Sequence, residues 1–382
     1  MSPIELLSKA DVSVRPEPSV VWSAKDARLT PRVSLTNAQR EQIADYAYRY
    51  GLAPESYDIL VADGDLLFTP CGTGVVSVLT DGKYWHIPGG ILAPEELKPR
   101  IIRWLKEISE VQGLTLLLYS ILPEEVGLFR EAGYEINMLG VEPIIELGNV
   151  DWSGSQHRWV RRQTSFCKRA SLETVEISDE GGRRAMASEL LDILTEDLSG
   201  RTFPKPLRLL EGAFDPGRLH QRRLFVARDK ANGSIHGFLA CSPMENGDAW
   251  AFETYRKRDS APRGTIPFLF REVIDLLQSE GVRRVSLCLV PGKSVLEQPN
   301  LEGHRMVRRI LDVWYHRMNA LFNIKGQDYF KQRFRPVDEP RYTCVSTHSS
   351  IWTLVSFLKT TGAMKPSPLN LMRNLWRSLR RK

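Results

Sequence analysis

The sequence predicts a mixed α/β protein in which one order of elements occurs twice. Strand-like and helix-like segments alternate from residue 36 onward in two similar series, and Asn232-Gly233 and Asn246-Gly247 are strong hairpin signals. The chain has 382 residues, of which 42% are hydrophobic, so it can fold around a sizeable core. At roughly 150 residues per domain, two or three domains are expected.

The first of the two series is predicted over 36–150, after a leader at 1–35 that is expected to be poorly ordered or loosely docked. Thr36-Asn37 has the residue types that cap a helix. The expected elements are a helix to Tyr50, strands at 57–61, 66–70 and 75–79, a helix at 94–112, a strand at 114–121, a helix at 124–132 and a pair of strands within 134–147.

The second series is predicted over 172–348, between a basic junction at 151–171 and C-terminal helices at 349–382 that end in a basic amphipathic tail. Its expected elements are a strand at 172–177, a helix at 183–198, strands at 223–228, 235–243 and 250–255, a helix at 264–279, a strand at 285–289, a helix at 304–322 and a strand at 342–346. The stretch between 199 and 220, which contains Pro and Arg, is expected to be a substrate-facing loop.

The charge and the cysteines exclude several classes of protein. The net charge of +6 equals the six Lys and Arg residues of the acid-free tail 365–382, so the rest of the chain is balanced. Five cysteines without a C-x-x-C pair predict a reduced compartment and no metal site. No signal peptide or apolar run of ~20 residues occurs, so a cytoplasmic protein with peripheral membrane attachment is expected.

Common catalytic motifs are missing from the sequence. No H-E-x-x-H, G-x-S-x-G or G-x-G-x-x-G motif occurs, which argues against metalloprotease, hydrolase and dinucleotide chemistry. Pro291-Gly-Lys-Ser294 resembles the end of a phosphate-binding loop, but the first glycine of that motif would fall at Leu287, inside a predicted strand. A plain strand-to-loop turn is the better interpretation.

A specific resemblance lies within 248–346. It rests on Trp250-Ala-Phe-Glu253-Thr-Tyr-Arg256, on Asp259-Ser-Ala-Pro262-Arg-Gly264 with the helix predicted at 265–277, and on Val285-Ser-Leu-Cys-Leu-Val-Pro291. It also rests on the run Phe322-Asn-Ile-Lys-Gly-Gln-Asp-Tyr-Phe-Lys331-Gln-Arg333-Phe-Arg-Pro-Val-Asp-Glu339-Pro-Arg341-Tyr342. These residues resemble the C-terminal domain of the bacterial phosphatidylglycerol lysyl- and alanyltransferases, or aminoacyl-phosphatidylglycerol synthases. The resemblance extends more weakly over 36–147 and 158–169.

The resemblance implies two tandem acetyltransferase-like (GNAT-like) folds, an aminoacyl-tRNA donor and a membrane lipid hydroxyl as acceptor, with phosphatidylglycerol as the expected lipid. It implies catalytic roles for Glu253, Arg256, Lys331 and Arg341, and substrate-binding roles for Asp259, Arg263, Gly264, Arg333, Glu339 and Tyr342. Three features depart from the family: Glu253 replaces the usual Asp, Asp338 replaces the usual Trp, and the membrane-spanning flippase part is missing, which leaves room for a separate flippase.

The residue types suit the chemistry of amino-acid transfer, although each has a structural alternative. Glu253 can bind the substrate ammonium or the acceptor hydroxyl, and Arg256 suits phosphate or the tRNA terminus. At i and i+3 on a strand the two face opposite sides unless a bulge intervenes, so a solvated pair at a strand end is the alternative. The basic residues around the turns expected at Pro336 and Pro340 suit an oxyanion or phosphate, or else form a salt-bridged surface loop.

The turn at 259–264 bears on the cofactor. An acetyltransferase holds the coenzyme A pyrophosphate on a glycine-rich turn before a helix, whereas this turn holds Pro262 and the single Gly264. Coenzyme A is therefore not expected, and no other cofactor is predicted. Asp259 can alternatively be the cap of the following helix.

Two basic patches are candidates for tRNA binding. One consists of Arg158, Arg161, Arg162, Lys168 and Arg169, and the other of Arg305, Arg308 and Arg309. Such patches neutralise RNA phosphates in a salt-dependent way, although solvated helix faces are the commoner explanation of a single patch.

The tail is predicted to be an amphipathic helix that lies on an anionic membrane. Its proposed membrane-binding residues are Leu369, Met372, Arg373, Trp376, Arg377, Leu379 and Arg380. The alternative is a terminal helix packed on the body. Together these features predict an aminoacyl-tRNA-dependent transferase acting on a membrane lipid; transfer to a soluble acceptor and a non-catalytic membrane- or RNA-binding module are the alternatives.

Overall fold

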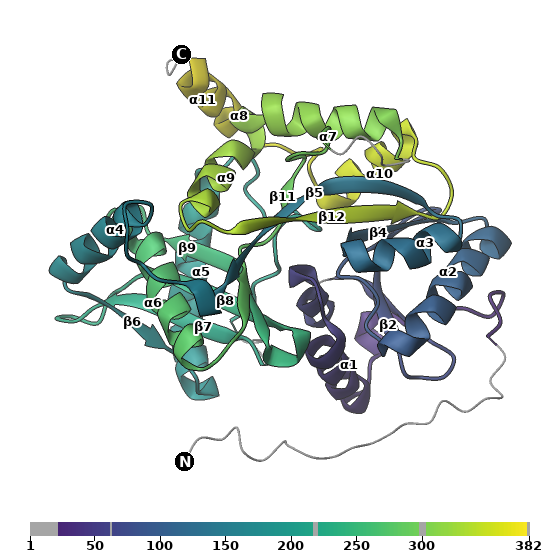
Figure 1. Cartoon of the computed structure of the whole chain (residues 1–382), viewed down its shortest axis with the longest axis horizontal. Helices are drawn as coiled ribbons and strands as arrows, with labels where there is room; N and C mark the ends of the chain where they lie inside the picture. The colour runs from purple at the N-terminus through teal and green to yellow at the C-terminus, as the bar shows by residue number, and fades with distance from the viewer. Residues whose placement is uncertain (1–21, 62, 217–220, 298–302, 380–382) are drawn as a thin grey trace.

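The computed structural model describes residues 22–61, 63–216, 221–297 and 303–379 (Figure 1). Its first half contains the elements η2 (Arg32–Ser34), α1 (Asn37–Tyr50), η3 (Pro54–Leu60), β1 (Asp65–Phe68), β2 (Val75–Asp81), β3 (Tyr84–Ile87), η4 (Glu95–Leu97), α2 (Lys98–Gln112), β4 (Thr115–Ile121), η5 (Pro123–Glu125), α3 (Val126–Glu131), β5 (Glu135–Glu146) and η6 (Leu147–Asn149).

The second half begins with a helix in the basic junction. Its elements are α4 (Arg158–Arg169), β6 (Leu172–Glu176), α5 (Glu180–Ser199), β7 (Arg223–Asp229), β8 (Ile235–Met244), η7 (Glu245–Gly247), β9 (Ala249–Lys257), α6 (Thr265–Ser279), β10 (Arg284–Ser286), β11 (Val290–Pro291), α7 (Arg305–Arg317), α8 (Asn319–Phe322), α9 (Ile324–Gln332), β12 (Val337–Val345), α10 (Ile351–Thr361) and α11 (Pro368–Leu379).

Among the described residues, twelve strands form one mixed sheet that runs through both halves of the chain. The order is β1-β2-β3-β4-β12-β5-β10-β9-β8-β7-β6, and β11 pairs with β5. The C-terminal strand β12 lies between β4 and β5 and is antiparallel to both, so the last part of the second series completes the sheet of the first. The mixed α/β class is confirmed.

Most predicted elements are present, and the first helix shows why. The Thr36 hydroxyl accepts a hydrogen bond from the Gln39 amide at 3.2 Å, and the Gln39 side chain accepts one from the Thr36 amide at 3.0 Å. This capping box starts α1 at the predicted residue. Strand β3 and helix α4 were not among the predicted elements, and the predicted strand pair at 134–147 is the single strand β5.

The predicted strand at 57–61 is wrong, because this segment is the 3-10 helix η3. Pro54 fixes the backbone at the first helical position, and the Ser56 hydroxyl accepts a hydrogen bond from the Ala53 amide at 3.2 Å. A run of five residues is too short for alternation to distinguish a strand from one side of a short helix. The segment packs against β8 and β9 of the second half.

Two large hydrophobic cores lie on the sheet. The first gathers side chains of β2 to β5 and α2 and also includes Trp314 of α7 and Phe357 of α10. The second surrounds α6 and the strands β7 to β10. Within the leader, the described residues from Trp22 onward pack on the first core, where the Trp22 and Trp104 rings lie 5.4 Å apart.

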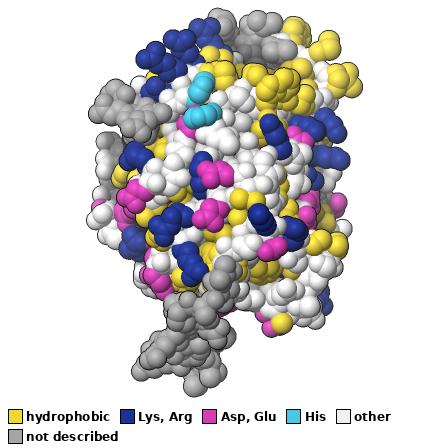
Figure 2. All heavy atoms as spheres, turned by 90° about the vertical axis from the view of Figure 1, so that its right-hand side faces the viewer, with side chains coloured by type: hydrophobic (Ala, Val, Ile, Leu, Met, Phe, Trp, Pro, Cys, Tyr) yellow, Lys and Arg dark blue, Asp and Glu magenta, His cyan; other side chains and the backbone are white. Residues whose placement is uncertain are grey.

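The surface agrees with a charge-balanced body. On the face shown in Figure 2, Lys and Arg side chains alternate with Asp and Glu over most of the area. Hydrophobic side chains gather at the upper edge, the side on which Figure 1 shows α7, α10 and α11.

Candidate functional site

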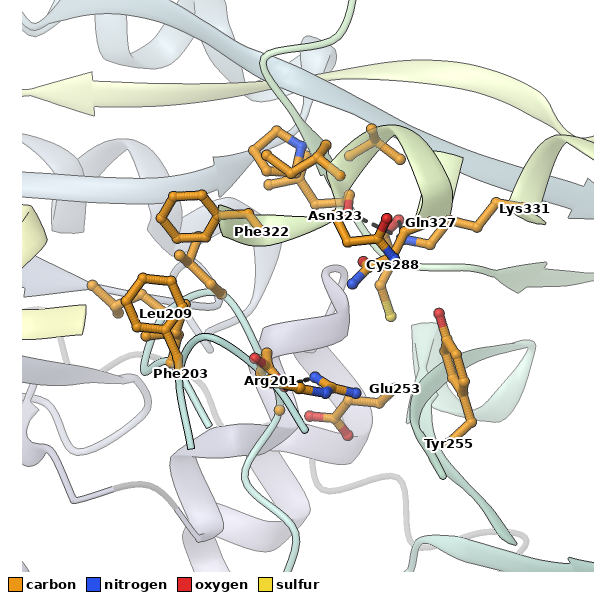
Figure 3. A pocket seen from close by; sticks show the side chains of 18 of the residues that line it. Arg201, Phe203, Leu209, Glu253, Tyr255, Cys288, Phe322, Asn323, Gln327 and Lys331 are labelled. Atoms are coloured by element: carbon orange, nitrogen blue, oxygen red, sulfur yellow. Dashed lines mark hydrogen bonds and ion pairs between the residues drawn. The ribbon is translucent and has the colours of Figure 1, made fainter. Parts of the chain in front are cut away.

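A cavity of about 850 Å³ lies where η3 of the first half meets the second half. The predicted residues Glu253, Arg256 and Lys331 all line it, and so do residues of the loop from Gly200 to Gly212. Its wall is divided by polarity: Figure 3 shows Phe203, Leu209 and Phe322 on one side, and Glu253, Tyr255, Cys288 and Lys331 on the other.

A β-bulge brings Glu253 and Arg256 to the same cavity. In the pairing of β8 with β9, Ala240 lies opposite Thr254 and Cys241 lies opposite Phe252, so Glu253 is the extra residue on β9. The bulge breaks the alternation that would place residues i and i+3 on opposite faces. Glu253 and Arg256, which strand alternation alone would place on opposite faces of the sheet, therefore both line the cavity.

Glu253 is part of a buried cluster of two carboxyl groups around one arginine. The Nη2 atom of Arg222 lies 3.2 Å from Oε2 of Glu253 and 3.1 Å from Oδ1 of Asp58, and the hydroxyl of Ser242 donates to Glu253. Burial and the nearby Glu253 raise the pKa of Asp58 well above its ordinary value. The cluster joins η3 of the first half to β8 and β9 of the second.

Arg256 belongs to a balanced group of two cations and two anions. Its Nη2 atom lies 2.8 Å from Glu211, and its Nε atom lies 3.2 Å from Asp197. Arg201 contacts the same two acids, at 3.1 and 2.5 Å respectively. The solvated pair at a strand end is not what forms, because the Arg256 side chain is only 9% exposed.

Lys331 of α9 is buried with its ammonium group on the backbone of the cavity wall. The Nζ atom donates to the carbonyl oxygens of Cys288 at 2.9 Å and Leu289 at 3.2 Å. Burial lowers the pKa of Lys331. Cys288 has a positive φ of 64°, a backbone conformation that few non-glycine residues adopt, and the lysine holds the carbonyl of this strained residue.

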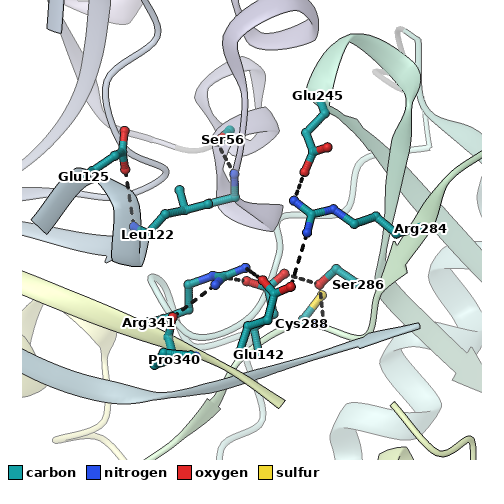
Figure 4. A network of polar contacts seen from close by, with 12 residues as sticks. Ser56, Leu122, Glu125, Glu142, Glu245, Arg284, Ser286, Cys288, Pro340 and Arg341 are labelled. Carbon is teal, nitrogen blue, oxygen red and sulfur yellow. Dashed lines mark hydrogen bonds and ion pairs between the residues drawn. The ribbon is translucent and has the colours of Figure 1, made fainter. Parts of the chain in front are cut away.

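Arg341 lies outside the cavity wall, in a polar network that joins three strands (Figure 4). Its Nε atom is 2.6 Å from Glu142, and both side chains are 1% exposed. Glu142 also accepts a hydrogen bond from Ser286, and the Ser286 hydroxyl accepts one from the Cys288 amide at 2.9 Å. The network therefore runs from β12 through β5 to the residue whose carbonyl binds Lys331.

The other predicted substrate-binding residues lie outside the cavity lining. Asp259 and Arg263 are exposed, and the cap of α6 is Gly264 rather than Asp259. Gly264 has a φ of 100°, and a Cβ there would meet Gln163 at 2.6 Å. Pro340 and the neighbouring Glu339 and Tyr342 lie within β12, so the expected turn at Pro340 is wrong. Arg333 stacks on Tyr329 and Trp159.

The two basic patches lie on different parts of the molecule, with α4 at the left and α7 at the top of Figure 1. On α4, Arg158, Arg162 and Arg169 are exposed. Arg161 donates to the Gly154 carbonyl and Lys168 pairs with Glu272 at 3.0 Å, so these two are partly engaged. On α7, Arg305 and Arg309 are exposed and Arg308 is half-buried.

Helix α11 docks beside the cavity and exposes three of its apolar side chains, Leu369, Met372 and Trp376. The side chain of Asn370 donates to the carbonyls of Ser199 and Arg201, at 2.9 and 2.8 Å, and Arg373 donates to that of Gly200. Leu369 and Met372 are 81% and 70% exposed, and Trp376 is also exposed. Arg377 and Leu379 belong to α11, whereas the predicted membrane residue Arg380 lies outside the described residues.

Several lining residues were missed by sequence reasoning. Glu55, Arg201 and Glu211 line the cavity without belonging to any motif, and Glu55 comes from the other half of the chain. Cys288 lies within the run 285–291 but was given no role. The only signal was the expectation that 199–220 faces a substrate. In the described part of the chain, no group of three or more His, Cys, Asp or Glu side chains is arranged to hold a metal ion.

Two of the solved structures that share this fold come from Agrobacterium fabrum and Bacillus licheniformis. The C-terminal domain assigned to a lysylphosphatidylglycerol synthetase from Agrobacterium fabrum superimposes with a TM-score of 0.71 at 20% identity, covering 87% of this chain and 98% of that one. L-PGS from Bacillus licheniformis gives a TM-score of 0.69 at 18% identity, covering 86% and 97%. The fold is thus that of a lysylphosphatidylglycerol synthetase C-terminal domain.

The family profile described as phosphatidylglycerol lysyltransferase, C-terminal, matches residues 48–345, and the chain belongs to this family. Similar relatives include an MprF-like domain protein of Mycobacterium tuberculosis, 22% identical over 83% of this chain, and a phosphatidylglycerol lysyltransferase of Bacillus subtilis, 22% identical over 85%. The matches span 63% and 37% of those two proteins. None of the helices described here has the length and apolar character needed to cross a membrane.

Proposed function

We propose that this chain transfers an amino acid from aminoacyl-tRNA to the hydroxyl of an anionic membrane lipid, phosphatidylglycerol, at the cytoplasmic face of a membrane. The observation that carries the proposal is the divided wall of the cavity, apolar on one side and charged on the other, in a chain of this family. The name of the Bacillus subtilis relative supports phosphatidylglycerol as acceptor.

The size of the cavity supports a headgroup rather than a whole lipid as its occupant. Pockets of about 300–1,000 Å³ enclose ligands of drug size, and the cavity of about 850 Å³ falls within this range. An aminoacyl ester and a glycerophosphate headgroup fit such a volume, whereas two long acyl chains do not. The acyl chains therefore stay in the membrane during the reaction.

The cluster around Arg222 suits an ammonium group. Two carboxyl groups, Asp58 and Glu253, share one guanidinium, so full ionisation leaves one negative charge without a cation. Burial and, after it, the negative charge of Glu253 raise the pKa of Asp58. The α-ammonium of an aminoacyl ester supplies the missing positive charge, and its arrival allows Asp58 to lose its proton.

Lys331 suits the oxyanion that develops when the ester carbonyl is attacked. A protonated lysine has three N–H donors, and two are used on the carbonyls of Cys288 and Leu289. The third stabilises the oxyanion, and the burial of the Lys331 side chain strengthens that interaction. Arg201 and Arg256 provide donors for the lipid phosphate on the adjoining wall.

The tRNA body binds to the basic face of α4 in this proposal. The Trp159 ring of α4 packs edge-on against Phe330 of α9, the helix that also carries Lys331, and against Phe334, which follows that helix. Contact of the tRNA backbone with α4 is therefore one helix away from the cavity. The lipid enters from the α11 side, because α11 is docked on residues 199–201 and two of these line the cavity.

The experiment is an assay of the purified chain with each charged tRNA and phosphatidylglycerol vesicles. Labelled aminoacyl-phosphatidylglycerol, identified by mass spectrometry, is the expected product, and deacylated tRNA and phosphatidylcholine vesicles are the controls. Product on a soluble acceptor without vesicles would instead favour a soluble-acceptor transferase. Absence of any product with every charged tRNA would contradict the proposal.

A further inference from the structure

The first half of the chain contributes a carboxyl group to the cavity through η3. Glu55 lines the cavity, directly after Pro54 at the start of this short helix. The segment is held closely: the Ser56 hydroxyl donates to the Gly89 carbonyl at 2.7 Å, and a Cβ on Gly89 would lie 2.6 Å from the Glu55 carbonyl oxygen. The backbone at Glu55 is therefore held in place by close packing.

The carboxyl of Glu55 has spare hydrogen-bonding capacity. Ser120 bonds to it, but its Oε2 atom is buried and has no hydrogen-bond partner within the described residues. Glu253 and Glu142, in contrast, are each paired with a buried arginine. A buried carboxylate oxygen without a partner is costly, and native sites retain such groups where a substrate supplies the partner.

Several charged or titratable groups surround Glu55, and together they set its protonation. The negative charges of Glu142 on β5 and Glu253 on β9 disfavour ionisation of Glu55, whereas the positive charge of Lys331 on α9 favours it. The Cys288 thiol also interacts electrostatically with Glu55. Burial, followed by Glu142, raises the pKa of Glu55 to about 7. A group with this pKa can both accept and donate a proton at neutral pH.

We propose that Glu55 is the general base and acid of the transfer. The role rests on the proposed function. Glu55 accepts the proton of the acceptor hydroxyl as the hydroxyl oxygen bonds to the aminoacyl carbonyl carbon. When the tetrahedral intermediate collapses, the bond between that carbon and the tRNA ribose oxygen breaks, and Glu55 returns the proton to the ribose oxygen. No further reactant is needed.

Glu253 is less suited to this step because its carboxylate is already occupied. It accepts a hydrogen bond from Ser242 and is paired with Arg222, while Asp58 is bonded to the same cluster. Removing a proton from a hydroxyl would require Glu253 to give up these partners. Glu253 binds, and Glu55 transfers the proton.

The test compares Glu55→Gln with the wild type and with Glu41→Gln, in which an exposed carboxylate of α1 is altered. Steady-state transfer from charged tRNA to phosphatidylglycerol vesicles is measured from acid to alkaline pH. Wild type and Glu41→Gln should gain kcat as the pH rises through about 7. Glu55→Gln should lose this limb and lower kcat by about 10²- to 10⁴-fold, with the KM of both substrates nearly unchanged.

Two results would overturn the role of Glu55 while leaving the proposed function standing. One is a Glu55→Gln variant with the wild-type pH profile. The other is a raised KM for aminoacyl-tRNA at unchanged kcat, which would make Glu55 a binding group for the ammonium. A wild type that makes no product with any charged tRNA would overturn the proposed function and the role together. Circular dichroism and a cooperative thermal transition verify that each variant is folded.

The protonation of Glu55 is also measured without turnover. Protein labelled with ¹³C at the glutamate carboxyl carbons is titrated by NMR, and the resonance absent from Glu55→Gln is assigned to Glu55. A midpoint near 7 is the expected result. A midpoint near the ordinary glutamate value would overturn the assignment as general base.

Discussion

Gly212 lies so close to Glu253 that a Cβ placed on the glycine would be 2.1 Å from the Glu253 Oε1 atom. The loop after α5 can cover the bulge on β9 only because residue 212 has no side chain. The Gly212 contact restrains the carboxylate, which is also bound by Ser242 of β8 and by Arg222, the residue before β7.

Gly212→Ala should therefore displace Glu253 and slow transfer by on the order of 100-fold, because small misplacements in a positioned site have effects of this size. Single-turnover transfer to phosphatidylglycerol measures the rate, and urea unfolding measures stability. Gly148→Ala is the control, since a Cβ there meets no atom within 4 Å. Equal rates for the two variants would show that the position of Glu253 does not limit the reaction.

The pH dependence of stability should carry the signature of Glu55. Its pKa is raised from 4.5 to about 7 in the folded protein, so the folded state binds this proton more tightly than the unfolded chain. The resulting stabilisation is fully present below the unfolded value and is lost as the pH rises through about 7. The wild type should lose roughly 3 kcal/mol more than Glu55→Gln across this window.

Urea unfolding at a series of pH values measures this difference in the free energy of unfolding. Glu41→Gln should follow the wild type throughout. Parallel curves for wild type and Glu55→Gln would mean that the Glu55 carboxyl ionises alike in both states.

The pair of Glu142 and Arg341 should be important for stability. Glu142→Gln or Arg341→Met removes one partner of a buried ion pair and should lower the free energy of unfolding by about 3–5 kcal/mol. The double variant should lose less than the sum, because no charge is then left without its partner. Since Arg341 does not line the cavity, transfer per folded molecule should fall less in the double variant than in Lys331→Met. The opposite order would make Arg341 a group that contacts substrate.

Membrane binding should depend on the outward residues of α11. Leu369→Glu with Met372→Glu should weaken binding to phosphatidylglycerol vesicles by at least about tenfold, because buried apolar groups supply the affinity of interfacial helices. Val33→Glu is the control, since this exposed valine lies in the first half. Vesicle sedimentation measures binding. Unchanged sedimentation of the double variant would leave α11 as a helix that only packs on the body.

Binding of tRNA should depend on α4. Arg162→Glu with Arg169→Glu should weaken tRNA binding and lower its salt dependence by about one for each phosphate contact removed. Arg305→Glu with Arg309→Glu on α7 is the matched pair, with the same change of charge. Filter binding at several salt concentrations compares them. A larger effect of the α7 pair would move the tRNA site to that helix.

Local signals were enough to predict much of the fold. The capping box at Thr36 and the hairpin signals at 232–233 and 246–247 act within a few residues, and the elements beside them are found as expected. Long-range pairing was not predictable in this way. The position of β12 between β4 and β5 depends on contacts between residues about 200 positions apart, for which a single sequence carries no periodic signal.

The candidate site was predicted only where a motif marked it. Glu253, Arg256 and Lys331 were predicted from the resemblance. Glu253 and Arg256 face the same cavity because of a bulge opposite Ala240 and Cys241, and no turn residue in the sequence indicates that bulge. Asp58 was missed because its segment was predicted to be a strand, and Glu55 was missed because it precedes that segment and belongs to no motif. Both lie near Glu253, which comes from the other half of the chain. A site between two halves is assembled by packing, which local patterns do not encode.

The insertion of β12 has a consequence for synthesis on the ribosome. Strands β4 and β5 are complete when residue 146 has been made, but the strand between them begins only at residue 337. At about 5–20 residues per second, the gap stays open for roughly 10–40 s. During that time the facing edges of β4 and β5 offer unpaired backbone groups to other chains. Nascent chains stalled before residue 337 should therefore need a chaperone that released full-length protein does not.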